Sequence, residues 1–204
     1  YNYLDEAGTL LYQAVRFKPK DFRQRTPAAG GGWVWKLGTV CRVLYRLPEL
    51  ISADPSEWVY VVEGEKDVDR LRDRGLVATT NCGGAGKWRA EYNEYLRGRR
   101  VAILPDNDQP GRDHAAKVAA ALAGIAAEIR VVDLPARPEK GDGSDWLDAG
   151  GAVEDLRRLA DLSHEPGPAP TAARPAAPPW VPYPVEVLPE PIRSYVTGSA
   201  DAIG

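Results

Sequence analysis

The chain has 204 residues, a formal net charge of −3 at pH 7, a hydrophobic fraction of 44% and a charged fraction of 27%. These values are typical of a globular domain with one core of ordinary size, and they exclude a generic polyanion binder. No run approaches about 18 apolar residues, which excludes a membrane-spanning helix.

The cysteines and the start of the chain carry two further expectations. Cys41 and Cys82 are too few for a zinc ribbon or a disulfide scaffold, so we expect a protein of the reducing cytoplasm. No charged-then-apolar signal segment opens the chain. The sequence contains no methionine, even at position 1, and we therefore expect an excised segment of a longer protein.

Residues 1–57 are predicted to form a β-rich, basic subdomain. Turn residues at 5–8 separate a short apolar start from the apolar run 10–17, a pattern that favours a hairpin. Aromatic and β-branched segments follow the hairpin. Residues 16–46 contain eight Lys or Arg residues and one acid, Asp21, so the near-neutral total hides a basic N-terminal region.

Residues 58–163 are predicted to form an α/β domain with a mainly parallel sheet flanked by helices. Apolar segments alternate here with helical patterns at a spacing that favours βαβ units. The predicted strands span residues 58–62, 76–80, 99–104 and 127–134, and the predicted helices span residues 65–75, 89–98, 111–125, 144–151 and 152–162.

The last part of the chain changes character. Residues 164–179 are rich in proline and alanine and are predicted to be a linker, because they offer no side chains that could build a core. Residues 180–204 resume with apolar and aromatic segments and are predicted to be the truncated start of a further domain.

Acidic residues follow three of the predicted strands. Glu63 ends the first strand, and Asp106 and Asp108 come just after the third. Ligands of parallel α/β sheets collect outside the carboxyl ends of the strands, so neighbouring strands would bring these carboxylates together. Asp142 and Asp145 follow the fourth predicted strand and could complete a second metal position.

A divalent cation would explain such a cluster. Carboxylates at this density repel one another and resist ionisation, whereas Mg²⁺ prefers oxygen ligands and keeps water positions for substrate phosphates. Two metal ions would clamp both oxygens of a phosphoryl transfer. The alternative for each acid is a helix cap or a solvated loop residue, and either Asp106 or Asp108 could cap the helix that starts near Gly111.

The order of these motifs resembles the Toprim domain, the metal-binding catalytic domain of bacterial primases, topoisomerases and several nucleases. The resemblance covers residues 57–150 and is carried by "VVEGEKD", "LPDNDQPGRDHA" and "GDGSDWL". It implies that Glu63 acts as the general acid or base and that Asp106 and Asp108 hold Mg²⁺ or Mn²⁺. Asp145 aligns with the last motif more surely than Asp142, because Gly143 precedes Ser144.

The loop "NCGGAGKW" contains three glycines and a lysine. It is not a Walker A motif, because Asn81 stands where the first glycine should be and Trp88 replaces the Ser or Thr. It is either a tight turn that needs positive φ or a close backbone approach to phosphate. The Toprim resemblance favours the second, with Gly83, Gly84 and Lys87 as phosphate-binding residues.

Four other residues near these motifs are candidates for phosphate-binding or surface positions. Gly64 and Lys66, at the start of the first helix of the α/β domain, are candidate phosphate-binding residues, and Lys66 and Lys140 can equally be solvated. His114 follows the Asp-x-Asp motif on a helix and is predicted to be a surface residue, since the family places its catalysis on carboxylates.

The basic N-terminal region interleaves cations with aromatic residues. Cations neutralise phosphates and aromatic rings stack on unpaired bases, so nucleic acid is the expected partner. The alternative is a strand whose aromatic side chains face a core. The candidate nucleic-acid-binding residues are Arg16, Lys20, Arg23, Arg25, Trp33 and Trp35.

The flanking segments also resemble parts of phage- and plasmid-type primases. Residues 1–50 resemble the region before Toprim, which implies a role in holding template and nucleotide, and residues 182–204 resemble the opening of a helicase-like domain. The leading hypothesis is therefore the metal-dependent core of a DNA primase. Its expected partners are single-stranded DNA, NTPs and a helicase domain of the same parent chain.

Two alternatives stay open at this point. A Toprim nuclease would use the same carboxylates to cleave nucleic acid, and a non-catalytic DNA-binding module would serve a helicase without chemistry. A topoisomerase is disfavoured because no tyrosine-bearing domain is visible. Primases usually also use a zinc-binding module, which this segment lacks, so independent initiation by the segment is in doubt.

Overall fold

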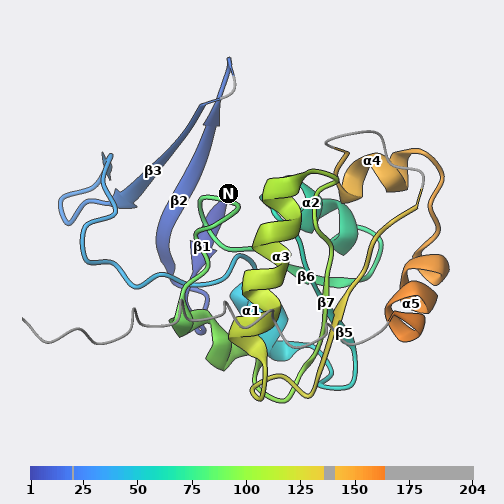
Figure 1. The fold of residues 1–204 in the computed structure, drawn as a ribbon. Coiled ribbons are helices and arrows are strands. Elements are labelled where there is room, and N and C mark those ends of the chain that lie inside the picture. Colours follow the sequence, from blue (N-terminus) through green and yellow to red (C-terminus); the bar gives the residue numbers. More distant parts are fainter. Residues whose placement is uncertain (20, 136–140, 164–204) are drawn as a thin grey trace, which may run out of the picture. The chain divides into compact units, whose positions relative to one another are not determined.

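A computed structural model describes residues 1–19, 21–135 and 141–163 (Figure 1). The chain divides into two compact units, Tyr1–Ala169 and Pro170–Gly204, and all described residues belong to the first. The predicted linker and the predicted further domain lie outside the described residues, and the domain boundaries stay a prediction.

The described residues form two sheets and their covering helices. In chain order the elements are β1 (Asn2–Leu4), β2 (Leu10–Phe17), β3 (Asp21–Pro27), β4 (Trp33–Val34), α1 (Leu47–Ser52), β5 (Trp58–Val61), α2 (Glu65–Arg72), β6 (Val77–Thr79), the 3₁₀ helix η1 (Ala90–Leu96), β7 (Arg100–Ile103), α3 (Gln109–Leu122), β8 (Glu128–Val131), α4 (Gly143–Asp148) and α5 (Val153–Leu162). Within the described ranges, no helix is long and apolar enough to cross a membrane.

The N-terminal sheet is antiparallel, in the order β1-β2-β3-β4. The predicted hairpin is confirmed: β1 pairs with β2 across a turn in which Gly8 adopts φ 84° and its N–H donates to the Asp5 carbonyl at 3.0 Å. Figure 1 shows β2 and β3 as a long hairpin at one side of the fold.

One part of the predicted β-rich region is helical instead. Residues 47–52 form α1, with Pro48 in its first turn, where a missing backbone N–H costs nothing because that group has no partner inside the helix. Leu47 and Leu50 lie one turn apart and are both buried. Burial of this apolar pair therefore outweighed the local β-like composition.

The second sheet is parallel, in the order β6-β5-β7-β8, which confirms the predicted α/β domain. Val61 pairs with Thr79 on one side and with Ile103 on the other, and Ile103 pairs with Val131, so all four strands end at one edge. Helix α3 packs on β7 and β8, and α2 packs on β6 (Figure 1). Glu63 and Asp106 follow the ends of adjacent strands.

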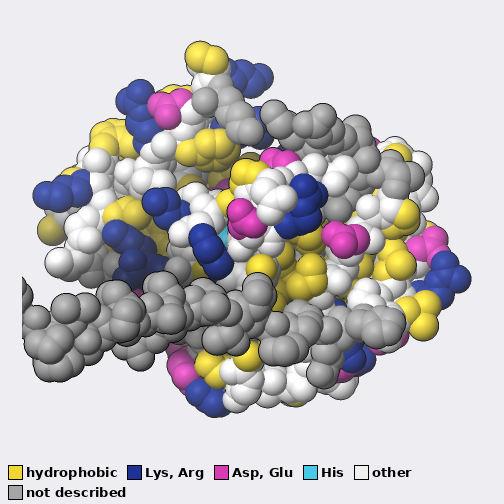
Figure 2. Space-filling view, viewed as in Figure 1, with side chains coloured by type: hydrophobic (Ala, Val, Ile, Leu, Met, Phe, Trp, Pro, Cys, Tyr) yellow, Lys and Arg dark blue, Asp and Glu magenta, His cyan; other side chains and the backbone are white. Residues whose placement is uncertain are grey.

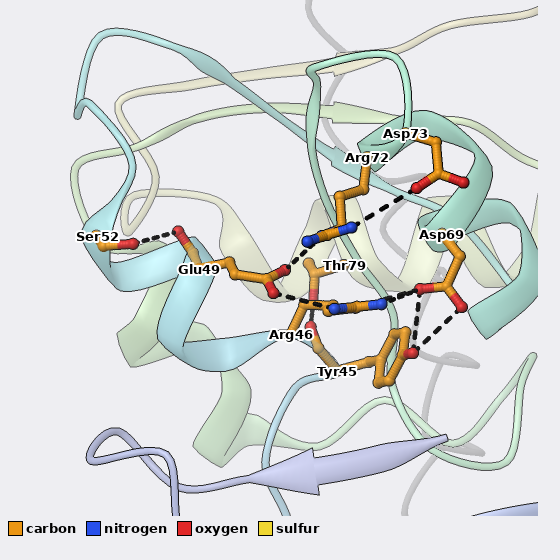
Figure 3. Close-up of polar contacts among 8 residues, drawn as sticks. All are labelled: Tyr45, Arg46, Glu49, Ser52, Asp69, Arg72, Asp73 and Thr79. Carbon is orange, nitrogen blue, oxygen red and sulfur yellow. Dashed lines mark hydrogen bonds and ion pairs between the residues drawn. The ribbon is translucent and has the colours of Figure 1, made fainter.

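A polar network joins the segment before α1 to α2 (Figure 3). Asp69 accepts hydrogen bonds from the Tyr45 hydroxyl at 3.1 Å and from Arg46 Nη2 at 2.7 Å. Arg46 also bonds Glu49, and it holds the left-handed backbone conformation, φ 61°. The Asp69 hydrogen bond is the main cause that raises the pKa of Arg46, against the effect of burial. This network fixes the outer face of the helix that begins next to Glu63.

Replacing Asp69 with alanine is expected to destabilise the fold by about 1–3 kcal/mol, because it leaves two half-buried donors, on Tyr45 and Arg46, without their acceptor. Urea unfolding measures this loss. Asp73→Ala is the matched control at the C-cap of the same helix, because the exposed Asp73 side chain pairs with Arg72 at 3.6 Å and takes no part in the network. Equal losses in the two variants would show that the network does not stabilise α2.

Candidate active site

A cavity of about 380 Å³ lies between the carboxyl edge of the parallel sheet and the N-terminal sheet. Its walls come from the segments after β5 and β7, from the first turn of α2, and from β2 and β3. Eight of the candidate site residues line it: Arg16, Glu63, Gly64, Lys66, Gly83, Gly84, Asp106 and Asp142. The structure thus brings residues from both subdomains to one place.

Glu63 and Asp106 are in contact through the backbone. The Asp106 N–H donates to Glu63 Oε1 at 3.3 Å. Gly111, in the first turn of α3, packs so closely that a Cβ there would lie 2.6 Å from both Glu63 Oε1 and the Asp106 carbonyl oxygen. The helix start is therefore seated directly against the two candidate catalytic positions.

The acids of the cavity interact electrostatically. Burial raises the pKa of Asp106 to about 7, and the neighbouring charges add to the effect, Glu63 most, followed by Asp67, Asp142 and Asp108. Burial also raises the pKa of Glu63, partly offset by the hydrogen bond from Asp106. A divalent cation bound among these carboxylates would favour their ionised forms and so lower the raised pKa values.

Asp108 caps a helix, which is the alternative role that the sequence offered for it. Its side chain accepts a hydrogen bond from the Gly111 N–H at 2.8 Å and so forms the N-cap of α3. It does not line the cavity, yet its charge contributes to the raised pKa of both Glu63 and Asp106. The cap role does not exclude a second role toward a cation.

The third acidic loop forms the start of α4. Asp142 and Asp145 make a reciprocal capping box, with the Asp145 N–H donating to Asp142 at 2.8 Å and the Asp142 N–H donating to Asp145 at 3.0 Å. Asp142 lines the cavity, whereas Asp145 is exposed. The geometry thus favours Asp142 as a residue of the site, although Asp145 is the residue that aligns better with the family motif.

Asp67 is an acidic residue of the cavity that the sequence analysis did not single out. It is buried and accepts hydrogen bonds from the Ser144 hydroxyl and, at 3.1 Å, from the Ser144 N–H. Burial raises its pKa, while the Ser144 hydrogen bonds and Lys66 oppose the shift. The signal was present in "VVEGEKD", because the first turn of a helix starting at Gly64 brings Asp67 back toward the strand end.

Glu65 is a second acidic residue of the cavity that was not predicted from the sequence. It is 9% exposed, lines the cavity and accepts a hydrogen bond from the buried Tyr3 hydroxyl at 2.9 Å. Tyr3 belongs to β1, so this contact ties the N-terminal sheet to α2. A pairing across 62 positions leaves no local pattern in the sequence.

The two candidate lysines lie in different places. Lys66 lines the cavity, with its Nζ 3.7 Å from Asp142 Oδ2. Lys87 is exposed and does not line the cavity, but its side chain passes close to Gly83, where an added Cβ would meet it at 3.4 Å. Lys140 lies outside the described residues.

The glycine loop is a tight turn, and its approach to phosphate stays a prediction. Gly83, Gly84 and Gly86 have φ values of 90°, 71° and 76°, conformations that favour glycine. Gly83 and Gly84 also line the cavity beside the acids. The turn is therefore tight and lies next to the acidic cluster.

His114 is not a surface residue, contrary to the prediction. It is 4% exposed, and its Nδ1 accepts a hydrogen bond from the Gly86 N–H at 3.0 Å. The prediction failed because it considered only the chemistry expected of the site. The side chain faces the glycine loop, a contact that depends on how α3 packs.

The aromatic side chains that alternate with Lys and Arg in the basic region are on the surface, so the alternative in which they face a core is wrong. Phe22, Trp33 and Trp35 are 41%, 38% and 52% exposed. The Arg25 guanidinium lies 3.9 Å from the centre of the Trp33 ring. Figure 2 shows Lys and Arg side chains beside hydrophobic ones over this sheet, at the left of the view. Lys20 lies outside the described residues.

This surface reaches the acidic cavity. Arg16 from β2 and Phe22 from β3 line the cavity together with Glu63 and Asp106. Within the part of the chain that the structure describes, no three His, Cys, Asp or Glu side chains are arranged to hold one metal ion. The assignment of metal ligands therefore stays a prediction.

No protein-family model matches the sequence, and no curated protein does either. Solved structures do match: a structure with the primase domains of bacteriophage T7 aligns with 80% of this chain and 76% of the matched chain, at 22% identity and a TM-score of 0.55. The DnaG primase catalytic domain bound to single-stranded DNA aligns with 81% of this chain, at 21% identity and a TM-score of 0.59.

The chain has the fold of a DNA primase catalytic core. The primase of Aquifex aeolicus, solved with its zinc-binding and RNA polymerase domains, aligns with 81% of this chain at 25% identity and a TM-score of 0.58. The chain spans 52% of the DnaG catalytic domain and 40% of the Aquifex aeolicus chain, so it corresponds to a part of those proteins. The predicted Toprim-type α/β fold with a preceding β-rich subdomain is confirmed.

Proposed function

We propose that this chain is the catalytic core of a metal-dependent DNA primase, which joins NTPs into primers on single-stranded DNA in the cytoplasm. One observation carries the proposal: within a primase-core fold, the acidic cluster and the Arg- and aromatic-rich sheet line the same cavity. A primase needs both, because template and nucleotide must meet at one set of carboxylates.

The cation would be Mg²⁺ or Mn²⁺, held by Asp106 and Asp108 with Asp142 or Asp145. The raised pKa of Asp106 supports the fit, because a carboxylate surrounded by other acids gains most from a nearby cation. When bound, the ion would neutralise the triphosphate and polarise the phosphate under attack. Oxygen ligands suit either metal, so Mn²⁺ is expected to replace Mg²⁺.

The remaining residues have separate roles in this proposal. Glu63 is the general acid or base, and burial raises its pKa above the usual range of a glutamate, as suits a group that exchanges a proton. Lys66, on the cavity wall, and Lys87, beside Gly83, neutralise phosphate charge, and the backbone of Gly64, Gly83 and Gly84 allows phosphates to approach closely.

Single-stranded DNA would bind along the N-terminal sheet, and one of the matched structures is a DnaG primase catalytic domain bound to single-stranded DNA. Arg16, Arg23 and Arg25, with Lys20, would contact phosphates, and Trp33 and Trp35 would stack on bases. We also propose that a helicase domain of the same parent chain is a partner, because one matched protein is the primase-helicase of bacteriophage T7.

Replacing Trp33 with alanine is expected to weaken single-stranded DNA binding by about tenfold, because one base loses its stacking partner. Fluorescence anisotropy with a labelled oligo(dT) measures the affinity. Ile51→Ala is the matched control, since Ile51 is an exposed apolar residue, 47% exposed, on α1. An equal loss of affinity in both variants would argue against base stacking on this sheet.

The test of function is a primer assay with the 204-residue chain, single-stranded DNA, labelled NTPs and Mg²⁺ or Mn²⁺. Templated products that depend on Asp106 support the proposal. Nicking of supercoiled plasmid without any NTP would instead support a Toprim nuclease. DNA binding without either reaction, unchanged in Glu63→Gln, would support a non-catalytic binding module.

A further inference from the structure

His114 makes a contact that the proposed chemistry does not use. Its Nδ1 accepts a hydrogen bond from the Gly86 N–H, which places the ring proton on Nε2 and makes the side chain a neutral imidazole. Among the described residues, Nε2 has no hydrogen-bond partner. Burial, and then Lys117, lower the pKa of His114 and so favour the same neutral form.

The glycine loop is held at two points. The Asn81 side chain donates to the Gly84 carbonyl at 2.8 Å, and His114 accepts from Gly86. Between these points, the N–H groups of Gly83 and Gly84 donate no hydrogen bond to any described residue. A glycine-rich segment is conformationally free unless it is restrained, and unpaired backbone N–H groups in left-handed turns bind anions.

Helix α3 connects His114 to the acidic cluster. Gly111 lies one turn before His114 on this helix and is packed against Glu63 and Asp106. The imidazole therefore links the glycine loop to the same rigid element that contacts the two acids. Among the described residues, His114 is the side chain that bonds to Gly86.

We propose that His114 is a positioning residue that holds the loop from Gly83 to Gly86 in the conformation that binds the triphosphate of an incoming nucleotide. The inference rests on the proposed primase function. Since the loop contacts phosphates and not the reacting atoms, loss of the His114 contact raises KM for the nucleotide and leaves kcat nearly unchanged.

The test compares His114→Ala with His114→Asn, because the Asn Oδ1 atom occupies nearly the place of Nδ1 and can accept from Gly86. We expect His114→Ala to raise KM for ATP by about tenfold, the effect of one lost hydrogen bond, and His114→Asn to restore most of the loss. Binding of Mg²⁺-tripolyphosphate, which has no base or ribose, is expected to weaken by the same factor as ATP binding.

Val118→Ala is the control for a general loss of packing, since Val118 is fully buried on the same helix. A scalar coupling across the N–H···N hydrogen bond in ¹⁵N-labelled protein reports the contact without any activity. An absent coupling in the wild type, an unchanged KM in His114→Ala, or an equal rise of KM in Val118→Ala would overturn the inference alone. A wild type that binds neither ATP nor tripolyphosphate would overturn the proposed function with it.

Discussion

Replacing Asp106 with asparagine is expected to lower primer synthesis by about a hundredfold or more while making the fold more stable at pH 8 without divalent metal. The loss of activity follows from removing a ligand of the cation that would stabilise charge at the reacting phosphate, and such electrostatic stabilisation acts on this scale in enzymes. The gain in stability follows from the raised pKa of Asp106, about 7, because folding disfavours its ionised form.

The pH dependence has a definite sign. The pKa of this carboxyl is about 7 in the fold and 3.8 without the fold's influence, so the destabilisation is absent at pH 3.8 and below, grows between these values and is complete above pH 7. For a fully buried carboxyl, a pKa rise of this size would lower the free energy of unfolding by about 4 kcal/mol. Asp106 is half-buried, and solvent screening reduces this loss to about 1–2 kcal/mol. Asparagine carries no charge and avoids the loss at every pH.

Urea unfolding in EDTA at pH 4 and pH 8 measures the difference, and added Mg²⁺ provides the control. The ion is expected to stabilise the wild type and not Asp106→Asn, because ligand binding to the folded state stabilises it by mass action. A variant that is less stable than the wild type at pH 8, or that still makes primers, would contradict the assignment of Asp106 to a metal-binding cluster.

Replacing Gly111 with alanine is expected to lower primer synthesis by about a hundredfold, although alanine normally favours a helix. The new Cβ would lie 2.6 Å from Glu63 Oε1 and from the Asp106 carbonyl, and 2.9 Å from the Asp106 N–H. Two of these atoms belong to the backbone and cannot rotate away, so the strand end or α3 must shift. Such overpacking costs about 1–3 kcal/mol of stability.

Gly143→Ala is the matched control, since Gly143 is in the first turn of α4 and a Cβ there meets nothing within 4 Å. Thermal unfolding and the primer assay should show both properties unchanged in that variant. If Gly111→Ala were as stable and active as the wild type, the close packing of α3 against the acids would be unimportant for the site.

The sequence by itself predicted the fold class and the place of the acidic cluster. Strand and helix periodicities are local, and an acid directly after a strand is readable without coordinates. Because parallel strands end at one edge, Glu63 and Asp106 could be expected to meet, and the pairing of β5 with β7 brings them together. The hairpin near residues 5–8 was predictable for the same reason, since turn chemistry is local.

Only the tertiary structure decided which side chains reach the cavity. Asp142 and not Asp145 lines it because the capping box sets the rotation of α4, and Asp67 joins them because α2 packs beside α4. His114 is buried because α3 lies against the glycine loop. These outcomes depend on the relative rotation of whole elements, which long-range packing determines and no short stretch of residues encodes.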